Sequence, residues 1–220
     1  MIHRAIEERI HNALAKKKAV TIMGPRQVGK STLADAIIPK DARILEINGD
    51  NTDVQTMFIN VDEAKMKVLI GNKNFLFVDE AQKIENVGNM LKIVAEKFKD
   101  VKIIVTGSSA FKLAEAVNES LTGRKREFRL YPLSFKEMAD ETSTLEESRM
   151  IDHRLIYGYY PEVVTSPGEE KEVLKELIDS YLYKDVMEEN NIAKPDKLVK
   201  LVQALAFQIG STVSAQERGG

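Results

Sequence analysis

Residues 24–31 read GPRQVGKS and lie between the apolar run AVTIM (19–23) and a helix-like stretch that starts at Ser31. Their spacing, G-x-x-x-x-G-K-[S/T] between a strand and a helix, is typical of a phosphate-binding loop. The glycines let successive backbone N–H groups turn inward toward phosphate oxygens, and the helix adds the positive end of its dipole. This stretch therefore predicts an α/β fold with a nucleotide phosphate site at the end of its first strand.

Residues of the loop have separate chemical tasks. We expect the Lys30 ammonium to reach the β- and γ-phosphates and the Ser31 hydroxyl to bind Mg²⁺. The residues expected to contact the nucleotide are Gly24, Pro25, Arg26, Gln27, Val28, Gly29, Lys30, Ser31 and Thr32. The alternative is a glycine-rich turn with an incidental lysine, which does not account for the flanking strand and helix.

Strand and helix patterns alternate outward from the loop. Further strands are predicted at 43–47, 74–80, 101–107 and 126–133. An apolar spacing of three and four predicts helices over 2–14 and 86–99. Strands that alternate with helices form a parallel sheet covered by helices on both faces. From residue 134 onward only helical patterns remain, so we expect a helical lobe to begin there.

Two acidic residues end the strand-like run FLFVDE (75–80). Ligands gather at the carboxyl ends of the strands in open α/β sheets. We therefore expect Asp79 to hold Mg²⁺ through water beside Ser31, and Glu80 to orient and polarise the attacking water. Without the phosphate loop, the same pair of acids would be an ordinary polar strand end.

Composition excludes several classes of protein. A formal net charge of -2 provides no overall attraction to nucleic acid or to an anionic membrane. The chain has no cysteine, which excludes disulfides and thiolate metal sites, and its three histidines lack metal-ligand spacing. No window approaches the roughly 18 apolar residues of a membrane span. We therefore expect a cytoplasmic protein with no membrane partner.

Four motifs occur in order: GPRQVGKST, FLFVDEAQKI, IIVTGSSAFKL and LTGRKREFRLYPLSFKEM. Together they resemble the AAA+ family of ATPases, and more closely the prokaryotic group in which an AAA domain precedes a C-terminal domain of unknown function. The resemblance covers residues 1–190. It implies a P-loop NTPase with the strand order 5-1-4-3-2, with ATP or ADP and Mg²⁺ as ligands and ATP hydrolysis as the activity.

The resemblance also implies roles for two further residues. Ser108, with Ser109 as the second choice, matches the polar sensor that contacts the γ-phosphate and the catalytic water. The alternative is that Ser109 caps a helix. Arg124, with Arg126 as the second choice, matches the arginine finger that usually reaches the γ-phosphate of a neighbouring subunit. A solvated strand edge and a nucleic-acid patch stay open for this basic cluster.

An adenine contact follows from the same resemblance. Related signal-transducing ATPases press the proline of a Gly-x-Pro element on the adenine, and GYYPEV (158–163) offers Pro161 at a spacing one residue longer. A helix break at Pro161 would explain the same letters. Ile2, His3 and Arg4 stand where family members line the adenine pocket from the N-terminal side.

The resemblance divides the chain into three regions. We expect an AAA+ nucleotide-binding domain over 1–133 and a helical lid lobe over 134–195. Over 196–220 we expect either the start of a winged-helix segment or a frayed tail. Since the family continues beyond this point, the chain is expected to be truncated at its C-terminus. A complete winged helix there could bind nucleic acid.

The leading functional hypothesis is an ATP-hydrolysing protein whose nucleotide state moves the helical lobe and a downstream domain or unknown protein partner. A homo-oligomer in which Arg124 acts in trans belongs to this hypothesis. The alternative is a slow regulatory switch, like the signal-transducing ATPases, with little intrinsic hydrolysis. A P-loop kinase fits less well because the chain offers no lid rich in Arg and Lys for an acceptor phosphate.

Overall fold

The computed structural model describes residues 2–108, 120–179 and 195–209 of the chain. The chain divides into two compact units, residues 1–165 and 166–220. The second unit contains α11 (Glu170–Leu177) and α13 (Pro195–Phe207). The domain boundaries expected after residues 133 and 195 stay predictions.

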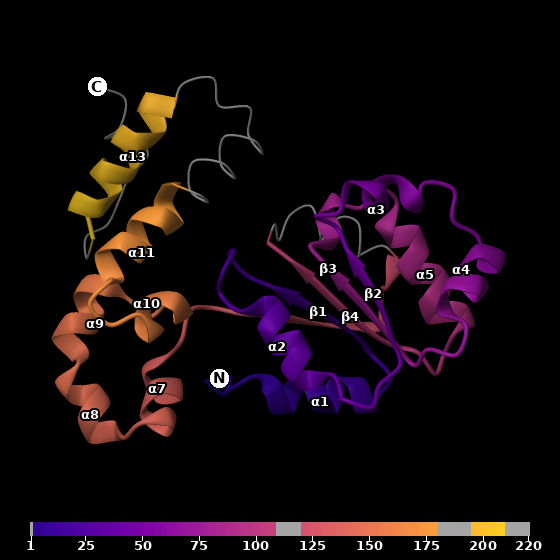
Figure 1. Cartoon of the computed structure of the whole chain (residues 1–220), viewed down its shortest axis with the longest axis horizontal. Coiled ribbons are helices and arrows are strands. Elements are labelled where there is room, and N and C mark those ends of the chain that lie inside the picture. Colours follow the sequence, from indigo (N-terminus) through magenta and orange to yellow (C-terminus); the bar gives the residue numbers. More distant parts are fainter. Residues whose placement is uncertain (1, 109–119, 180–194, 210–220) are drawn as a thin grey trace. The chain divides into compact units, whose positions relative to one another are not determined.

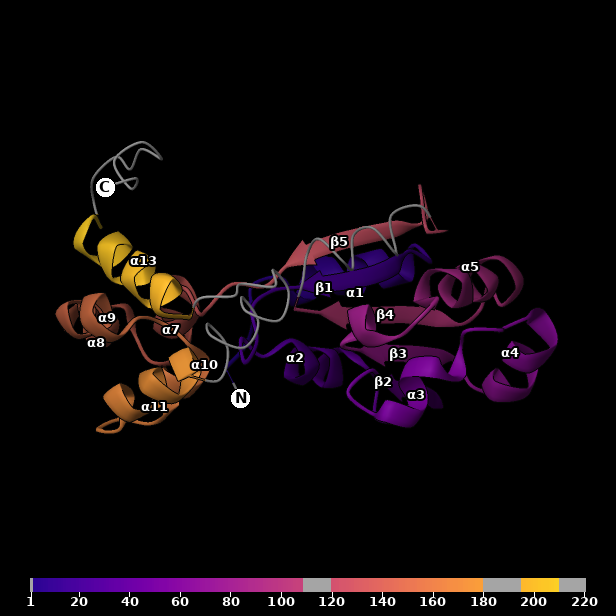
Figure 2. The same ribbon diagram turned by 90° about the horizontal axis from the view of Figure 1, so that it is seen from above.

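In the described part of the first unit, five parallel strands form one sheet in the order β2-β3-β4-β1-β5. The strands are β1 (Ala19–Met23), β2 (Ile44–Asn48), β3 (Phe75–Asp79), β4 (Lys102–Gly107) and β5 (Lys125–Arg129). Figure 2 shows them side by side in this order. The predicted α/β fold and the strand order 5-1-4-3-2 are confirmed.

Helices cover both faces of this sheet. They are α1 (Glu7–Ala15), α2 (Lys30–Ile37), α3 (Thr52–Met57), α4 (Glu63–Ile70) and α5 (Val87–Lys97). Side chains of α1 and α2 share one core, and side chains of α4 and α5 share another, on the opposite side of the strands (Figure 1). Along β1, Val20 and Ile22 belong to the first core, and Ala19 and Met23 to the second. Because both faces are covered, every residue of this strand is buried and its pattern does not alternate.

Short helices follow the sheet: α7 (Phe135–Glu141), α8 (Thr144–Arg149), α9 (Ile151–Tyr157) and α10 (Pro161–Thr165). Met150 separates α8 from α9, as the C-cap of the first and the N-cap of the second. The helix break expected at Pro161 lies before this proline, because α9 ends at Tyr157 and its C-cap, Gly158, has a positive φ of 77°. Pro161 itself begins α10, where its fixed φ suits a first helical position.

None of the helices within residues 2–108, 120–179 and 195–209 combines the length and the apolar character that crossing a membrane requires.

Candidate active site

The loop between β1 and α2 is fixed at both ends by its glycines. A Cβ on Gly24 would lie 2.3 Å from the carbonyl oxygen of Leu130, so the backbones approach too closely for any other residue. Gly29 has a left-handed φ of 92° immediately before Lys30 begins α2, and Gln27 is also left-handed with φ 55°. Two such residues within three positions curl the backbone, as an anion-binding loop requires.

Lys30 is buried beneath this loop. Its side chain is 4% exposed, and Nζ donates to the Pro25 carbonyl at 3.0 Å and lies 3.6 Å from Glu80 Oε1. Burial lowers the pKa of Lys30, although the Glu80 carboxylate acts in the opposite direction. A buried ammonium needs anionic partners. Lys30 is therefore suited to exchange its contact with Glu80 for phosphate oxygens.

Ser31 and Asp79 meet at the carboxyl ends of the strands. The Ser31 hydroxyl donates to Asp79 Oδ2 at 2.9 Å and to Oδ1 at 3.1 Å. Thr106, fully buried at the end of β4, also donates to Asp79 Oδ1, and it accepts from the Glu80 backbone N–H at 3.2 Å. Hydroxyl and carboxylate oxygens are the ligands that Mg²⁺ prefers, completed by phosphate and water. The residues present thus fit a magnesium ion.

Glu80 is held in an uncommon backbone conformation. Its φ of 47° and ψ of 45° are left-handed, and such residues cluster at functional sites. A Cβ on Gly49 would lie 2.4 Å from the Glu80 carbonyl oxygen, so only glycine fits against this turn. The turn brings the carboxylate to Ser108, whose hydroxyl donates to Glu80 Oε2 at 3.0 Å. The second sensor choice, Ser109, lies outside the described residues.

A cavity of ≈ 430 Å³ opens beside the loop, within the first unit. Its lining is mainly apolar and includes Ile2, Arg4, Thr32 and Pro161. The residues predicted to contact adenine, from the N-terminal segment and at Pro161, therefore line the same cavity as residues of the phosphate loop. An apolar cavity with a few polar groups is typical of a small-molecule site. His3 is not among its described lining residues: the imidazole is 77% exposed and lies 2.9 Å from Glu7.

Arg4 also forms a buried ion pair with Glu137 on α7. Their side chains are 8% and 9% exposed, with 3.1 Å between Arg4 Nε and Glu137 Oε1. The guanidinium donates further to the Val28 carbonyl in the loop at 3.0 Å and to the Tyr131 carbonyl after β5 at 2.6 Å. Arg4 therefore ties the N-terminal segment, the phosphate loop and the start of α7 to one another.

Hydrogen bonds determine the charge state of Glu137. Burial alone would raise the pKa of its carboxyl, but donation from the Ala5 and Ser134 backbone N–H groups and from Arg4 outweighs burial and lowers the pKa. A carboxyl with a lowered pKa in the folded state contributes stability at pH values above its unfolded pKa. This contribution is lost as the pH falls through the folded pKa.

The substitution Glu137→Gln is expected to lower the free energy of unfolding by about 3 kcal/mol at neutral pH, because Arg4 stays buried without its counter-charge. The variant should also lose less stability than wild type between neutral pH and about pH 3, which is below the usual glutamate pKa. Urea unfolding at both pH values measures this. Glu141→Gln, exposed at the end of the same helix, is the matched control. Equal pH dependence in wild type and Glu137→Gln would contradict the account.

Arg124 lies at the amino ends of the strands, opposite the carboxyl ends where the phosphate loop is. It directly precedes β5, and its carbonyl accepts from the backbone N–H of Ala19, where β1 begins. The phosphate loop follows Met23, four residues later, which is about 13 Å along the strand. The structure therefore does not bring Arg124 to the other predicted site residues of its own chain. Arg126, the second choice, is an exposed residue within β5.

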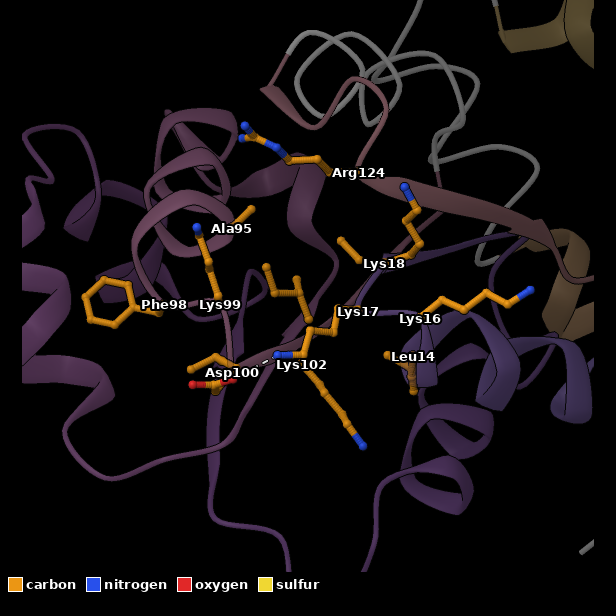
Figure 3. A pocket seen from close by; sticks show the side chains of 13 residues that line it. Leu14, Lys16, Lys17, Lys18, Ala95, Phe98, Lys99, Asp100, Lys102 and Arg124 are labelled. Atoms are coloured by element: carbon orange, nitrogen blue, oxygen red, sulfur yellow. Dashed lines mark hydrogen bonds and ion pairs between the residues drawn. The ribbon is translucent and has the colours of Figure 1, made fainter.

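The basic residues around Arg124 line a small cavity of ≈ 170 Å³ (Figure 3). Arg124 pairs with Glu96 at 2.9 Å, and Lys17 pairs with Asp100 at 3.0 Å. Figure 3 shows the Lys16 and Arg124 side chains pointing in opposite directions. These cations do not converge on one point, so the cavity lacks the geometry of a small-anion site.

Several residues of the site were not predicted from the sequence. Thr106 had a visible signal, as a polar residue that ends an apolar strand. Glu137 had another, the S-x-x-E spacing of a capping box with Ser134, which the structure forms. Gly49 had no local signal, because the reason for glycine there is the Glu80 carbonyl, far along the chain.

A family model that describes an AAA domain matches residues 16–139, more than half of the chain. The chain belongs to this AAA family. A second model, the domain of unknown function DUF8612, matches residues 148–219. An AAA domain followed by a domain of unknown function confirms the resemblance drawn from the four motifs.

Relatives of this AAA protein come from distant organisms. An uncharacterized protein of Methanocaldococcus jannaschii is 29% identical over 231 residues, which cover 97% of this chain and 52% of that protein. An uncharacterized protein of Haemophilus influenzae is 29% identical over 147 residues, 64% of this chain and 36% of that protein. The chain thus spans about half the length of the first relative and about a third of the second.

Among solved structures, a Walker-type ATPase of Pyrococcus abyssi has a similar fold, with a TM-score of 0.57. The match covers 98% of this chain and 86% of that one, at 15% sequence identity. At this identity the likeness concerns the fold alone.

Proposed function

We propose that this AAA protein binds Mg-ATP in the loop of residues 24–31 and hydrolyses it. The observation that carries the proposal is the assembly of four side chains at the carboxyl edge of the sheet. Ser31 contacts Asp79 at 2.9 Å, and Lys30 lies 3.6 Å from Glu80, in a protein whose fold and family are those of P-loop ATPases. Each of the four has the chemistry that phosphoryl transfer to water needs.

In this proposal, Lys30 leaves Glu80 and binds the β- and γ-phosphates. Ser31 and Asp79 hold Mg²⁺, which neutralises charge on the phosphate oxygens when bound. Glu80 accepts a hydrogen bond from the attacking water, and Ser108 adjoins the same carboxylate. The water oxygen bonds to the γ-phosphorus, the bond from that phosphorus to the bridging oxygen breaks, and ADP leaves with the electron pair. The proton of the water passes to Glu80.

The apolar cavity beside the loop is the proposed adenine site. Ile2, Arg4, Thr32 and Pro161 line it within the first unit. Because Arg4 contacts both the loop carbonyl of Val28 and α7, a change in the loop on nucleotide binding would reach the helical segment through this ion pair. This contact supports coupling between nucleotide state and helix position, and from there to a downstream domain or protein partner.

One observation favours the slow switch as a second candidate. Arg124 lies at the end of the strands opposite its own phosphate loop, so within one chain it does not reach the site. An arginine finger contributes about 10³ to 10⁵ in rate. A chain that does not assemble would then bind nucleotide and hydrolyse it very slowly.

Replacement of the buried lysine tests the site itself. Lys30→Ala is expected to weaken Mg-ATP binding roughly 100-fold, since a charge-assisted hydrogen bond to phosphate contributes about 3 kcal/mol. Calorimetric titration of Mg-ATP into wild type and variant measures the change, with Lys92→Ala, exposed on α5, as the matched control. Equal affinity in wild type and Lys30→Ala would overturn the proposal.

A further inference from the structure

Gln82 lies in the 3₁₀ helix η1 (Ala81–Lys83), two residues after Glu80. The left-handed turn at Glu80 is what allows both side chains to face the same point. Gln82 Nε2 donates to Glu80 Oε2 at 2.5 Å and to Ser108 Oγ at 2.9 Å. The Ser108 hydroxyl donates to the same Glu80 oxygen at 3.0 Å. Three side chains from two strand ends thus close a triangle of hydrogen bonds.

This triangle determines which atoms of Glu80 remain available. Oε2 receives both neutral donors, and Oε1 faces Lys30 at 3.6 Å. A carboxylate held at two points keeps one orientation, which a general base requires for a water in a defined place. Gln82 also orients the Ser108 hydroxyl, because the Gln82 amide donates a hydrogen bond to the oxygen of that hydroxyl. Gln82 therefore organises both predicted catalytic neighbours.

The carbonyl oxygen of the Gln82 amide, Oε1, has a different environment from Nε2. Gln82 Oε1 is buried and has no hydrogen-bond partner among the residues that the structure describes. A buried amide oxygen without a partner costs about 1–3 kcal/mol, so native proteins rarely keep one without a reason. The amide that carries this oxygen adjoins the Glu80 carboxylate through Nε2, so a water bound between the two side chains would give the oxygen its missing partner.

We propose that Gln82 is a further catalytic residue of this ATPase, an inference that rests on the proposed hydrolysis. Nε2 holds the Glu80 carboxylate and the Ser108 hydroxyl in place, and Oε1 accepts a hydrogen bond from the attacking water. With its two hydrogens directed to Glu80 and Gln82, the water presents a lone pair to the γ-phosphorus. An amide is suited to this task because it carries a donor and an acceptor in one plane.

Two substitutions separate hydrogen bonding from packing. Gln82→Met keeps the length of the side chain but removes the donor and the acceptor, and Gln82→Glu keeps an acceptor but places a like charge beside Glu80. Both are expected to lower kcat roughly 10- to 100-fold, as small displacements of reacting groups do. The KM for ATP, and the affinity for a fluorescent non-hydrolysable ATP analogue, should stay within about twofold. Lys83→Ala, in the same short helix, is the matched control and should keep the wild-type rate.

A double substitution provides a readout that packing would not change. If Gln82 and Glu80 act on the same water, Glu80→Gln combined with Gln82→Met should be no more than about threefold slower than Glu80→Gln alone. Additive losses would overturn the inference, and so would a wild-type kcat in Gln82→Met or a loss of analogue binding in that variant. A wild-type protein that releases no phosphate at any concentration would overturn the proposed function first, before any Gln82 variant is compared.

Discussion

Arg124→Ala is expected to lower ATP turnover about 10³- to 10⁵-fold, the largest effect of any single substitution in this protein. The reason is the charge that spreads over the γ-phosphate in the transition state, which a planar guanidinium stabilises. Because Arg124 lies at the end of the strands opposite its own loop, the proposed role requires it to act on the nucleotide of a second copy. Turnover per subunit of wild type should therefore rise with protein concentration.

Mixing two inactive variants tests action in trans directly. Arg124→Ala keeps an intact phosphate site, and Lys30→Ala keeps the arginine, so a mixture of the two should recover part of the wild-type rate. Arg43→Ala, an exposed arginine just before β2, is the control for loss of positive charge. No recovery in the mixture, or a wild-type rate for Arg124→Ala at every protein concentration, would contradict a role in trans.

Glu80→Gln is expected to reduce kcat about 10²- to 10⁴-fold, because the amide cannot accept the proton of the attacking water. ATP affinity should be kept or increased, since the neutral side chain no longer competes with phosphate for Lys30, which now lies 3.6 Å from it. Chromatography of the nucleotide bound after incubation with Mg-ATP measures the effect. Wild type should retain ADP and Glu80→Gln should retain ATP.

Glu85→Gln is the control for this substitution, because it removes an exposed carboxylate a few residues away. It should behave as wild type in both turnover and the identity of the bound nucleotide. A Glu80→Gln variant that forms ADP as fast as wild type would show that the base is another group, and the candidate site would then be assigned wrongly.

The sheet could be predicted from sequence because its signals are local. β1, β3 and β4 are short and largely apolar, and the structure places every strand of the sheet within a few residues of its expected range. The loop motif also places Lys30 and Ser31, and Asp79 and Glu80 follow a buried strand. These positions depend on neighbours in the chain, which is the information that a single sequence contains.

Contacts between distant residues could not be predicted in the same way. Arg4 and Glu137 are 133 positions apart, and their pairing depends on how the N-terminal segment meets α7. The glycine at position 49 is explained only by the Glu80 carbonyl against it. Gln82 lies within the motif FLFVDEAQKI, but its proposed role depends on the left-handed turn at Glu80, which no residue type at that position predicts.

The central claim is that water attacks the γ-phosphate of ATP in this site, and isotope labelling tests it most directly. Wild-type protein at the highest soluble concentration is incubated with Mg-ATP in ¹⁸O-labelled water, and the released phosphate is analysed by mass spectrometry. The account predicts phosphate that carries ¹⁸O from the solvent, formed at a rate that falls with Glu80→Gln. Binding of Mg-ATP without any labelled phosphate, at every protein concentration, would contradict it.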